Sequence, residues 1–583
     1  MLFETSRADS DGARTLFFHS PLETLTATEP GELPGLFERM ERRRAEGRWA
    51  AGFIAYECGY HLDDVLPHPP AAAGTPLARF GIFEAPTAFG AVTDDEVPES
   101  TESPVRNLQI SIGAEAYHHA VERIRRYIAE GDAYQVNFTD AVTFGTDASP
   151  EELYVHLRRR QRVPYAAFLN LGERHILSFS PELFFRTAGR TITCRPMKGT
   201  APRGADLDGD RRNAEWLRTD EKNRSENLMI VDLLRNDLGR ICVPGSVAVP
   251  AMFSVETYDS VLQMTSTVTG TLRPEVRLFD IVRALFPCGS VTGAPKIRAM
   301  QIIRELERHE RGVYCGAVGF ISPEGDAVFN VPIRTVELSG GNGRMGVGSG
   351  IVFDSDPVRE YDECLLKASF LTRAVPDHSL IETMLWENGF PLLDLHLDRL
   401  RSSAEYFGIP MDEGTVRAAL KNEALQHPPG TRRRFRLLLR RDGRYDIESS
   451  ELAERTVRPV MRLAPERIRS TDPSRRHKTT DREVYDRYAR TAAEEGILEY
   501  LFLNERGEAA EGSIHSLFIE TGTGLLTPPL ESGALPGVYR RYVLETDPRA
   551  KEAVITLDDV RNANELFLCN ALRGMRRVTF SEE

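Results

Sequence analysis

Cysteine is scarce in this chain: seven residues are scattered among 583, and no two form a C-x-x-C pair. Neither a zinc site nor a disulfide framework is therefore indicated, and the cysteines are interpreted as reduced thiols. The sequence also lacks a signal-peptide pattern and any apolar run long enough to span a bilayer. These absences predict a cytoplasmic protein without a membrane partner.

An excess of positive charge is missing too, because the formal net charge is -14. This balance argues against nucleic acid or an anionic membrane as the main partner, although a locally basic site for a small anion remains compatible with it. The length exceeds that of one ordinary core, so at least two domains are expected. The segment 373–378 is the predicted boundary, which gives domains 1–375 and 379–583.

One turn-rich stretch, Cys194-Arg-Pro-Met-Lys-Gly-Thr-Ala-Pro-Arg-Gly204, holds a lysine between prolines and glycines. Such a backbone can approach a ligand closely, and a partly desolvated Lys198 would become a usable nucleophile. In isolation, a surface loop lysine is the commoner interpretation.

Local patterns predict several elements. They are a buried strand and turn at 49–60, an exposed loop at 91–108, helices at 115–130, 220–235 and 356–372, strands at 133–138 and 346–352, a strand pair at 176–186, a loop at 286–296 that feeds a helix to about 308 with Pro295 in its first turn, and a hairpin strand with a solvated face at 431–441.

Three glutamates are candidate metal ligands. Glu360 and Glu363 share one helix face with Lys367, and Glu226 lies on another predicted helix. Two carboxylates on a helix usually form a solvated face. Together with Glu226 they could instead hold Mg²⁺, which prefers few carboxylates plus water and substrate oxygens.

The first domain resembles the chorismate-utilising family, which includes anthranilate, isochorismate, salicylate and aminodeoxychorismate synthases. The resemblance covers the core 115–372 and rests on Ser180-Pro-Glu182, Lys198-Gly-Thr-Ala201, Glu226 with Asp232-Leu-Leu-Arg-Asn-Asp237, Gly289-Ser-Val-Thr-Gly-Ala-Pro-Lys296, Tyr314-Cys-Gly-Ala-Val-Gly319, Ile333-Arg334, Gly348-Ser-Gly-Ile351 and Glu360-x-x-Glu363-x-x-x-Lys367. It implies an α+β fold, an anthranilate synthase-like chorismate-binding β-sandwich flanked by helices.

The resemblance also implies roles. Lys198 would attack C2 of chorismate as the C4 hydroxyl leaves, with Glu182 as general acid, and ammonia would then add at C4. Mg²⁺ would be held by Glu226, Glu360 and Glu363. The implied substrate-binding residues are Thr200, Thr292, Tyr314, Arg334, Gly348, Gly350 and Lys367.

Three positions select the branch within that family. Gln135 stands where isochorismate and salicylate synthases carry a water-activating lysine, which argues against water addition. Lys198 stands where anthranilate synthases usually have alanine, and Gln263 where they have a histidine linked to pyruvate elimination. The resemblance therefore implies aminodeoxychorismate synthase component I. No glutaminase-like cysteine constellation is found, so ammonia would be free or delivered by a separate glutamine amidotransferase subunit.

The second domain resembles the fold-type IV pyridoxal-phosphate enzymes, which include aminodeoxychorismate lyase and branched-chain aminotransferases. The motifs are Leu380-Ile-Glu-Thr-Met384, Gly389-Phe-Pro-Leu-Leu-Asp-Leu-His396-Leu-Asp-Arg399, Lys478-Thr-Thr-Asp-Arg482, Ala510-Glu511-Gly-Ser-Ile-His-Ser-Leu-Phe518, Leu535-Pro-Gly537-Val-Tyr-Arg540 and Phe567-Leu-Cys-Asn-Ala-Leu-Arg-Gly574. A smaller α+β domain is implied, with a homodimer through this domain as one assembly that the resemblance allows.

Cofactor roles follow from that resemblance. Lys478 would form the Schiff base with pyridoxal phosphate, Glu511 would hold the pyridinium nitrogen, and Arg399 with the Gly537 and Val538 amides would hold the phosphate. Ala571 stands where relatives usually offer a hydroxyl, so somewhat weaker cofactor binding is expected.

The two domains together predict a bifunctional enzyme that makes 4-aminobenzoate, the folate precursor, by amination of chorismate and elimination of pyruvate. Three alternatives stay open at this point. The first domain could be an anthranilate synthase component I, and the second could be another class IV aminotransferase or an inactive dimerisation scaffold.

Overall fold

The structure is a computed structural model that describes residues 1–5, 15–66, 75–89, 103–372, 378–453, 457–522 and 524–582. It divides into two compact units. The first contains Met1–Pro202 and Ala214–Val375, and the second contains Arg203–Asn213 and Pro376–Glu583. A short segment from within the predicted first domain is thus grouped with the second unit. Among the described residues, no helix has both the length and the apolar character needed to cross a membrane.

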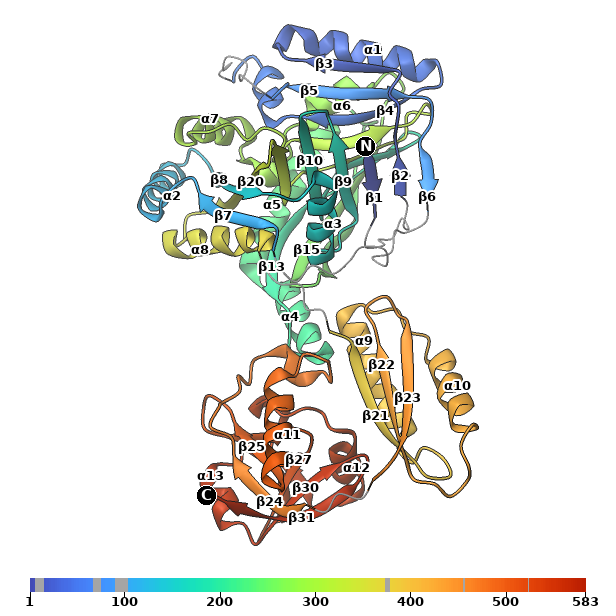
Figure 1. Ribbon diagram of the computed structural model, residues 1–583. Coiled ribbons are helices and arrows are strands. Elements are labelled where there is room, and N and C mark those ends of the chain that lie inside the picture. Colours follow the sequence, from blue (N-terminus) through green and yellow to red (C-terminus); the bar gives the residue numbers. More distant parts are fainter. Residues whose placement is uncertain are drawn as a thin grey trace. The chain divides into compact units, whose positions relative to one another are not determined.

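Two ten-stranded antiparallel sheets form the first unit (Figure 1). One contains, in spatial order, β16 (Gly293–Ala294), β8 (Gln135–Thr146), β20 (Asn342–Ile351), β19 (Thr335–Ser339), β10 (Arg174–Ser180), β9 (Tyr165–Asn170), β1 (Leu2–Glu4), β2 (Thr15–Phe17) and β6 (Thr87–Phe89), with β7 (Val105–Ile110) paired to β8.

The other sheet contains β13 (Met197–Pro202), β15 (Val261–Thr271), β12 (Thr191–Arg195), β11 (Leu183–Ala188), β18 (Ala327–Asn330), β17 (Ala317–Ile321), β4 (Trp49–Ile54), β5 (Ala78–Phe83) and β3 (Glu23–Ala27), with β14 (Ala248–Thr257) paired to β15.

An aromatic core lies between the two sheets. It joins Phe3 of β1 and Ile176 of β10 to Phe53 of β4 and Phe83 of β5. Successive strand residues point to opposite faces, so strands such as β4 bury one face against the other sheet and the other face against helices. This arrangement explains why β4 is apolar along its whole length, and it confirms the predicted sandwich.

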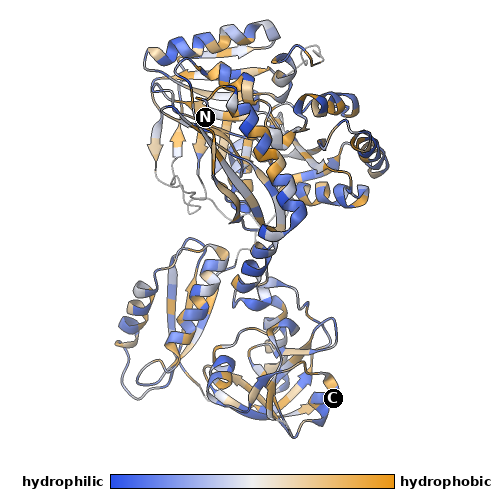
Figure 2. Cartoon of the chain, turned by 180° about the vertical axis from the view of Figure 1, so that it is seen from behind, coloured by the Kyte–Doolittle hydropathy of each residue, from blue (hydrophilic) through white to orange (hydrophobic). Residues whose placement is uncertain are grey.

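Helices cover the outer faces of the sandwich. The cluster on one sheet includes side chains of α1 (Leu33–Ala45), α5 (Glu221–Gly239) and α6 (Leu278–Leu285). The cluster on the other includes α2 (Ala114–Ala129), α3 (Pro150–Arg160), α7 (Lys296–Leu306) and α8 (Pro357–Ala368). In Figure 2 the helices carry blue, hydrophilic stretches beside orange ones, as expected for elements that bury one face.

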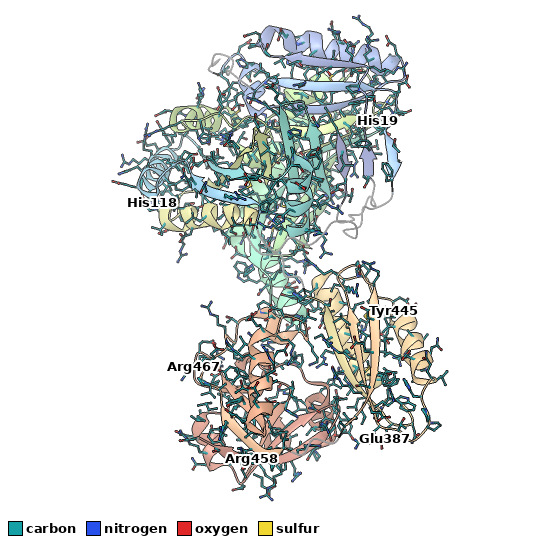
Figure 3. The ribbon with its side chains drawn as sticks, viewed as in Figure 1. His19, His118, Glu387, Tyr445, Arg458 and Arg467 are labelled. Carbon is teal, nitrogen blue, oxygen red and sulfur yellow. The ribbon has the colours of Figure 1, made fainter. Side chains whose placement is uncertain are left out.

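The second unit has a small layer and a large layer. The small one is the antiparallel sheet β21 (Leu380–Trp386), β22 (Arg433–Leu439) and β23 (Tyr445–Glu451), packed on α9 (Leu393–Phe407) and α10 (Glu413–Ala424). Figure 3 labels Tyr445 at the start of β23.

The large layer is an eight-stranded mixed sheet. Its order is β26 (Ala509–Gly512), β25 (Ile497–Leu503), β24 (Arg458–Leu463), β31 (Gly574–Ser581), β30 (Glu565–Asn570), β27 (Ser516–Thr521), β28 (Gly524–Thr527) and β29 (Ala550–Glu552). The accompanying helices are α11 (Glu483–Glu495), α12 (Val538–Thr546) and α13 (Leu557–Asn562), while α4 (Leu207–Thr219) spans the boundary between the units in sequence.

Several local predictions are confirmed, and capping explains the boundaries. Asp220 caps α5 by accepting from the Asn223 amide, and Asp356 caps α8 by accepting from the Val358 and Arg359 amides. The strand at 49–54, the helix at 114–129 and the hairpin strand at 433–439 are present where expected.

Other predictions need correction. The predicted strand pair at 176–186 is two strands in different sheets, because the chain crosses from β10 to β11 at Pro181-Glu182. Pro295 is the N-cap of α7 and not a residue of its first turn. The helix predicted to end at Arg235 continues to Gly239. Most of the loop predicted at 91–108 lies outside the described residues, and its last part is strand β7.

Arg311 is the largest fully buried side chain of the described residues, with 1% of its surface exposed. Its guanidinium donates to Glu307 on both oxygens and to the carbonyls of Val291 and Asn137 at 2.7 Å each. It also lies over the Tyr56 ring, 4.3 Å from the centroid. One buried cation therefore ties β8, α7 and the loop before α7 together.

We predict that Arg311→Met lowers the free energy of unfolding by roughly 3–5 kcal/mol, because Glu307 would be left as a buried, uncompensated charge. Urea unfolding followed by circular dichroism measures the change. The exposed Arg308→Met, on the same segment, is the matched control. Equal losses in the two variants would contradict the prediction.

Candidate active sites

Lys198 has a fixed backbone in the first unit. It is the second residue of β13, and its carbonyl accepts from Asn227 Nδ2 at 3.2 Å. Asn227 is buried and also accepts from Ser266 Oγ at 2.6 Å. Gly199 follows with φ +96°, a conformation that glycine adopts readily. The lysine is thus held by its neighbours and is not a loose surface residue.

The Lys198 amine lies among charged groups. Burial lowers its pKa, and this effect is opposed by the negative charges of Glu226, Glu182 and Glu363 and reinforced by Lys367. A lysine with a lowered pKa has more neutral amine near pH 7 and is a better nucleophile.

Gly350 of β20 is the point where Lys198 and Gln135 meet. A Cβ added at Gly350 would lie 2.8 Å from the Lys198 amine and would overlap the Gln135 amide nitrogen. Gln135 is 1% exposed, and neither of its side-chain polar atoms has a hydrogen-bond partner within the described part of the chain. A buried amide without partners is costly unless a ligand satisfies it.

Glu182 stands at the crossing between the two sheets and is 3% exposed. Its amide donates to Ser180 Oγ at 3.1 Å, which in turn donates to the Val331 carbonyl. Burial raises the pKa of the Glu182 carboxyl to about 7, although Ser290 and Lys198 oppose the shift. A carboxyl that is about half protonated at neutral pH can act as a general acid.

Two further cations belong to the same region. Arg334 has φ +52°, and burial lowers its pKa to about 10. Within the described ranges no hydrogen bond or ion pair of its guanidinium was found. The Lys367 amine donates to the Gly348 carbonyl at 2.6 Å and pairs with Glu363 at 2.7 Å. Positive charge is therefore available for an anion.

The three carboxylates predicted to bind metal lie on two helices, Glu226 on α5 and the other two on α8. Burial raises the pKa of Glu226, and Glu360 contributes to this shift by charge repulsion. Burial opposes ionisation of Glu363, but Lys367 prevails and the pKa is lowered. The donor chemistry suits Mg²⁺, yet no group of three or more acidic, His or Cys side chains within the described ranges is close enough to hold a metal.

The remaining predicted substrate residues have varied surroundings. Thr200 donates to Gln263 Oε1 at 3.1 Å from an exposed position. Thr292 is fully buried, and its hydroxyl donates to the Cys288 carbonyl at 3.1 Å. The Tyr314 ring fills the space beside Gly346, where any side chain would collide with it. Of these three residues, Thr200 is the exposed one.

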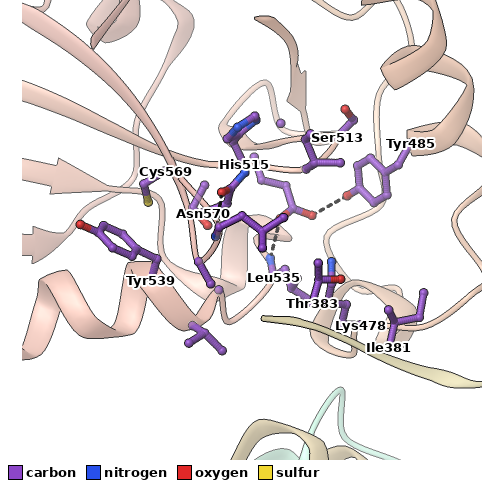
Figure 4. Close-up of a pocket in the computed structure, with 18 of the residues that line it drawn as sticks. Ile381, Thr383, Lys478, Tyr485, Ser513, His515, Leu535, Tyr539, Cys569 and Asn570 are labelled. Atoms are coloured by element: carbon purple, nitrogen blue, oxygen red, sulfur yellow. Dashed lines mark hydrogen bonds between the residues drawn. The ribbon is translucent and has the colours of Figure 1, made fainter. Parts of the chain in front are cut away.

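The second unit contains a pocket between its small and large layers (Figure 4). Lys478 lines it, and burial, together with Arg482 and Arg399, lowers the pKa of its amine to about 7. The Lys478 carbonyl accepts from the Ile381 amide at 2.7 Å, which joins the lysine segment to β21.

Glu511 lies in the same pocket and is buried. It accepts from the Tyr485 hydroxyl at 2.6 Å and from the Leu535 amide at 3.0 Å, the two bonds drawn in Figure 4. Burial raises its pKa, so a cationic partner would favour the ionised form.

Arg399 is oriented by Glu382, which is 1% exposed. The guanidinium donates to both carboxylate oxygens at 2.8 and 2.7 Å and to the Pro536 carbonyl at 3.2 Å. His396 Nδ1 lies 2.6 Å from the same carboxylate. Burial alone would raise the pKa of Glu382, but Arg399 and His396 lower it to about 2. Arg399 therefore has one fixed orientation at the pocket wall.

The start of α12 completes the pocket. Gly537 is the N-cap, and a Cβ there would lie 2.6 Å from Ser516 Oγ. The Gly537 amide donates to the Leu535 carbonyl at 2.7 Å, whereas Val538 begins the helix, where amides lack intrahelical partners. Ala571 lines the pocket after β30.

These residues fit pyridoxal phosphate on their chemistry. The pocket offers an amine of lowered pKa, a buried carboxylate for a pyridinium nitrogen, a fixed arginine, and a helix start that favours a phosphate. A side chain at position 537 would collide with Ser516 Oγ, so only glycine allows the backbone to approach this closely.

Two pocket arginines add to the sequence interpretation of residues 431–441. Arg434, which is exposed, and Arg436, which is half-buried, alternate on β22, and both also line the pocket. Alternation alone could not show which layer would cover the polar face of the strand.

Comparison with known proteins identifies the first unit. The family model of chorismate binding enzymes matches residues 10–373. The chain belongs to the chorismate-binding enzyme family. Residues 379–580 match the class IV amino-transferases, so a chorismate-binding domain is followed by a class IV aminotransferase domain.

The relatives come from two branches of that family. Aminodeoxychorismate synthase of Streptomyces griseus is 41% identical over 353 residues, which are 60% of this chain and 46% of that protein. Anthranilate synthase component 1 of Saccharolobus solfataricus is 41% identical over 355 residues, 59% of this chain and 82% of that protein. The chain thus spans about half the length of the first curated relatives it matches.

Among solved structures, anthranilate synthase component I from Streptococcus pneumoniae has a TM-score of 0.55 and 27% identity. The match covers 62% of this chain and 92% of that one. The sandwich of this chorismate-binding enzyme therefore has a known counterpart.

Sequence reasoning missed the residues that support the sites. Asn227 and Tyr485 had no motif of their own, because their roles depend on partners distant in sequence. Glu382 was visible within the Leu380-Ile-Glu-Thr-Met384 motif, but its pairing with Arg399 requires the fold to bring α9 against β21.

We predict that Gly350→Ala disrupts the first site, because the new methyl would displace the Gln135 amide and the Lys198 amine. A stability loss of roughly 1–3 kcal/mol is expected from overpacking, together with loss of chorismate binding measured by calorimetry. Gly145→Ala on the neighbouring β8 is the matched control, because its nearest atom is 4.0 Å away. Normal chorismate binding by Gly350→Ala would contradict the close approach.

Proposed function

We propose that this chorismate-binding enzyme is bifunctional. Its first domain converts chorismate and ammonia into 4-amino-4-deoxychorismate, and its second domain removes pyruvate from that product to give 4-aminobenzoate. The observation that carries the proposal is the Lys198 amine, which lies with Gln135 at Gly350 and within electrostatic reach of Glu182.

In the proposed first reaction, the Lys198 nitrogen bonds to C2 of the ring while the C4–O bond breaks. Glu182 gives its proton to the departing hydroxyl, which leaves as water. Ammonia then bonds to C4, and the C2–N bond to Lys198 breaks. The lowered pKa of Lys198 and the raised pKa of Glu182 are the shifts that each role requires.

Anion binding in the first site is assigned to nearby cations. Arg334 and Lys367 are proposed to pair with the two carboxylates of chorismate, beside the Gly348 and Gly350 backbone, Thr200 and Tyr314. Thr292 is proposed to act through the backbone, because its hydroxyl is already used. Glu226, Glu360 and Glu363 have the donor chemistry for Mg²⁺, which would supply electrostatic orientation of a ring carboxylate, although within the described residues they are not grouped closely enough to hold it.

We assign the preference for ammonia over water as the nucleophile to Gln135. An uncharged amide cannot activate water as a lysine would, so ammonia is the proposed nucleophile. Its proposed source is a separate glutamine amidotransferase subunit. Gln263, bonded to Thr200, stands in place of the histidine linked to pyruvate elimination in anthranilate synthases.

The second domain is proposed to act with pyridoxal phosphate. The cofactor, when bound, supplies an electron sink for deprotonation at the carbon that bears the amine. Lys478 removes the C4 proton and later protonates the departing enolpyruvyl group. Glu511 would hold the pyridine nitrogen, while Arg399, the Val538 amide at the start of α12 and the Ala571 amide would hold the phosphate. The Gly537 amide, which was predicted to share this role, already donates to the Leu535 carbonyl.

Arg434 and Arg436 are proposed to bind the carboxylates of the incoming intermediate. Both lie at the pocket on β22. A dianionic substrate suits two guanidinium groups better than the single acid group of most amino acids.

Two of the three alternatives have an observation against them. An anthranilate synthase would not need an enclosed Lys198 amine. An inactive scaffold would not need a lysine whose pKa is about 7 beside a buried carboxylate. Another class IV aminotransferase is the strongest alternative, and amino acids that bleach the cofactor absorbance would support it.

We predict that the wild type, given chorismate, Mg²⁺, ammonium and pyridoxal phosphate, forms 4-aminobenzoate as resolved by mass. Lys478→Ala is expected to stop at 4-amino-4-deoxychorismate, and Lys198→Ala to slow its formation by at least about 100-fold, the usual scale for loss of a catalytic group. Formation of 2-aminobenzoate would overturn the branch, and arrest of the wild type at the intermediate would overturn the lyase assignment.

Glu182→Gln gives a second prediction. The native pKa of about 7, against an ordinary value of 4.5, means that the stability linked to Glu182 is present below about pH 4.5 and is lost as the pH rises through 7. Glutamine cannot ionise, so the variant should gain roughly 3 kcal/mol over the wild type at pH 8 and nothing at pH 4.5. Amination should be lost.

Denaturant unfolding at the two pH values measures this difference, with the exposed Glu173→Gln as control. A variant that keeps wild-type amination, or whose stability does not diverge from the wild type as the pH rises, would contradict the assignment of Glu182 as a buried acid.

A further inference from the structure

A short segment of the first domain's sequence belongs to the second unit. Residues 203–213 directly follow β13, the strand that carries Lys198, and are grouped with Pro376–Glu583. The first domain's chain thus supplies part of the unit that holds the second pocket.

Within the segment, the Asp210 carboxylate binds the two residues at its start. Asp210 accepts from Arg203 Nε at 3.0 and 2.9 Å on its two oxygens and from the Gly204 amide at 2.7 Å. Arg203 and Asp210 are both nearly buried, with side chains 9% exposed. A buried bidentate pair of this kind holds a defined geometry.

Arg203 and Gly204 contact Tyr406 at the end of α9. The guanidinium lies over the Tyr406 ring at 4.2 Å and donates to the Tyr406 carbonyl at 2.8 Å. The Tyr406 hydroxyl donates back to the Gly204 carbonyl at 2.8 Å. Residues 203–204 and Tyr406 are therefore joined by two hydrogen bonds, one donated from each side.

His477, the residue before Lys478, is the next layer of this stack. Its ring lies on Tyr406 with centroids 4.3 Å apart and an angle of 25°. His477 Nε2 is 3.2 Å from the Ala205 carbonyl, and Nδ1 is 2.9 Å from Ser403 Oγ. Burial lowers the pKa of His477 to about 4, so the ring is neutral. Because a carbonyl only accepts, the proton is on Nε2 and Nδ1 accepts from Ser403.

The peptide of Lys478 is thereby held from two sides. The Ile381 amide donates to its carbonyl, Thr479 bridges to Leu380, and His477 is fixed by residues 203–205. A second tie joins Arg476 to Asp206 at 3.7 Å.

We propose that residues 203–213 are a positioning element of the second active site, which sets the place of the Lys478 amine through Tyr406 and His477. The inference rests on the proposed role of Lys478 in holding pyridoxal phosphate. It implies that residues 379–583 without this segment lack part of their own site.

The test compares full-length variants loaded with pyridoxal phosphate. Arg203→Ala removes the stack and the bidentate pair. Arg203→Lys keeps the positive charge but loses the planar guanidinium that binds the Asp210 carboxylate through two N–H groups. Arg211→Ala is the matched control, because it lies on the same segment, pairs only with Asp208 among the described residues, and has a side chain 72% exposed.

Two readouts are measured: the pH midpoint of the bound cofactor's visible absorbance and the dissociation constant for pyridoxal phosphate. Arg203→Ala should raise the midpoint by roughly one pH unit, because a looser site hydrates the cationic lysine nitrogen better. It should also weaken cofactor binding about 10-fold. Arg203→Lys should recover part of both changes, and Arg211→Ala should match the wild type.

The charged groups around Lys478 stay unaltered in these variants: Arg482, Arg399 on α9, Glu382 on β21 and Glu511 on β26. If Arg203→Ala does not fold, Tyr406→Phe removes only the bond to Gly204 and should give a smaller shift of the same sign.

A variant that melts earlier but keeps the wild-type midpoint and dissociation constant would overturn the positioning role. Failure of the proposed function is distinguished by Lys478→Ala. If that variant keeps the wild-type cofactor absorbance, Lys478 does not hold the cofactor, and the fault lies with the proposed function.

Discussion

A lysine amine removed from water loses proton affinity, because its charged form is no longer hydrated. Each unit of this chain holds one such lysine in a half-buried position, Lys198 in the first and Lys478 in the second, and in each the pKa of the amine is lowered by burial. To lower the pKa of a lysine amine by a limited amount, the fold must hold the amine partly out of water and must keep a carboxylate at a fixed distance from it. Much of the structure around each site can be understood as meeting that requirement.

The two units meet it by different means. In the first, a glycine lets two strands approach the amine, since Gly350 leaves room for both Lys198 and Gln135. In the second, the lysine lies on a loop whose backbone is fixed by β21 on one side and by residues 203–205 on the other. On a strand, the register of the sheet fixes where the lysine lies. On a loop, contacts with other residues must fix its position.

Buried ion pairs supply the rigidity in both cases. Arg311 with Glu307, Arg399 with Glu382 and Arg203 with Asp210 are bidentate pairs, and of these residues Arg399 lines the pocket of the second unit. Such pairs contribute little net stability compared with apolar packing, but removal of one partner is costly, so they specify one geometry. The chain uses arginine in all three pairs, in keeping with the fork that arginine presents to a carboxylate.

The sequence by itself determined the two domains' families through their ordered motifs, and the sandwich followed from that resemblance. Hydrophobic period and capping residues predicted four of the helices, at 115–130, 220–235, 356–372 and after residue 296. The caps Asp220 and Asp356 are examples of local signals that the structure repeats. Tertiary structure alone decided what the local signals could not encode. The crossing at Glu182 between sheets, the exposure of Arg434 and Arg436 to a pocket, and the grouping of residues 203–213 with the second unit all depend on partners distant in the chain. A local sequence pattern indicates which face of a helix or strand is polar. Which other element, pocket or solvent that face contacts is decided by tertiary packing.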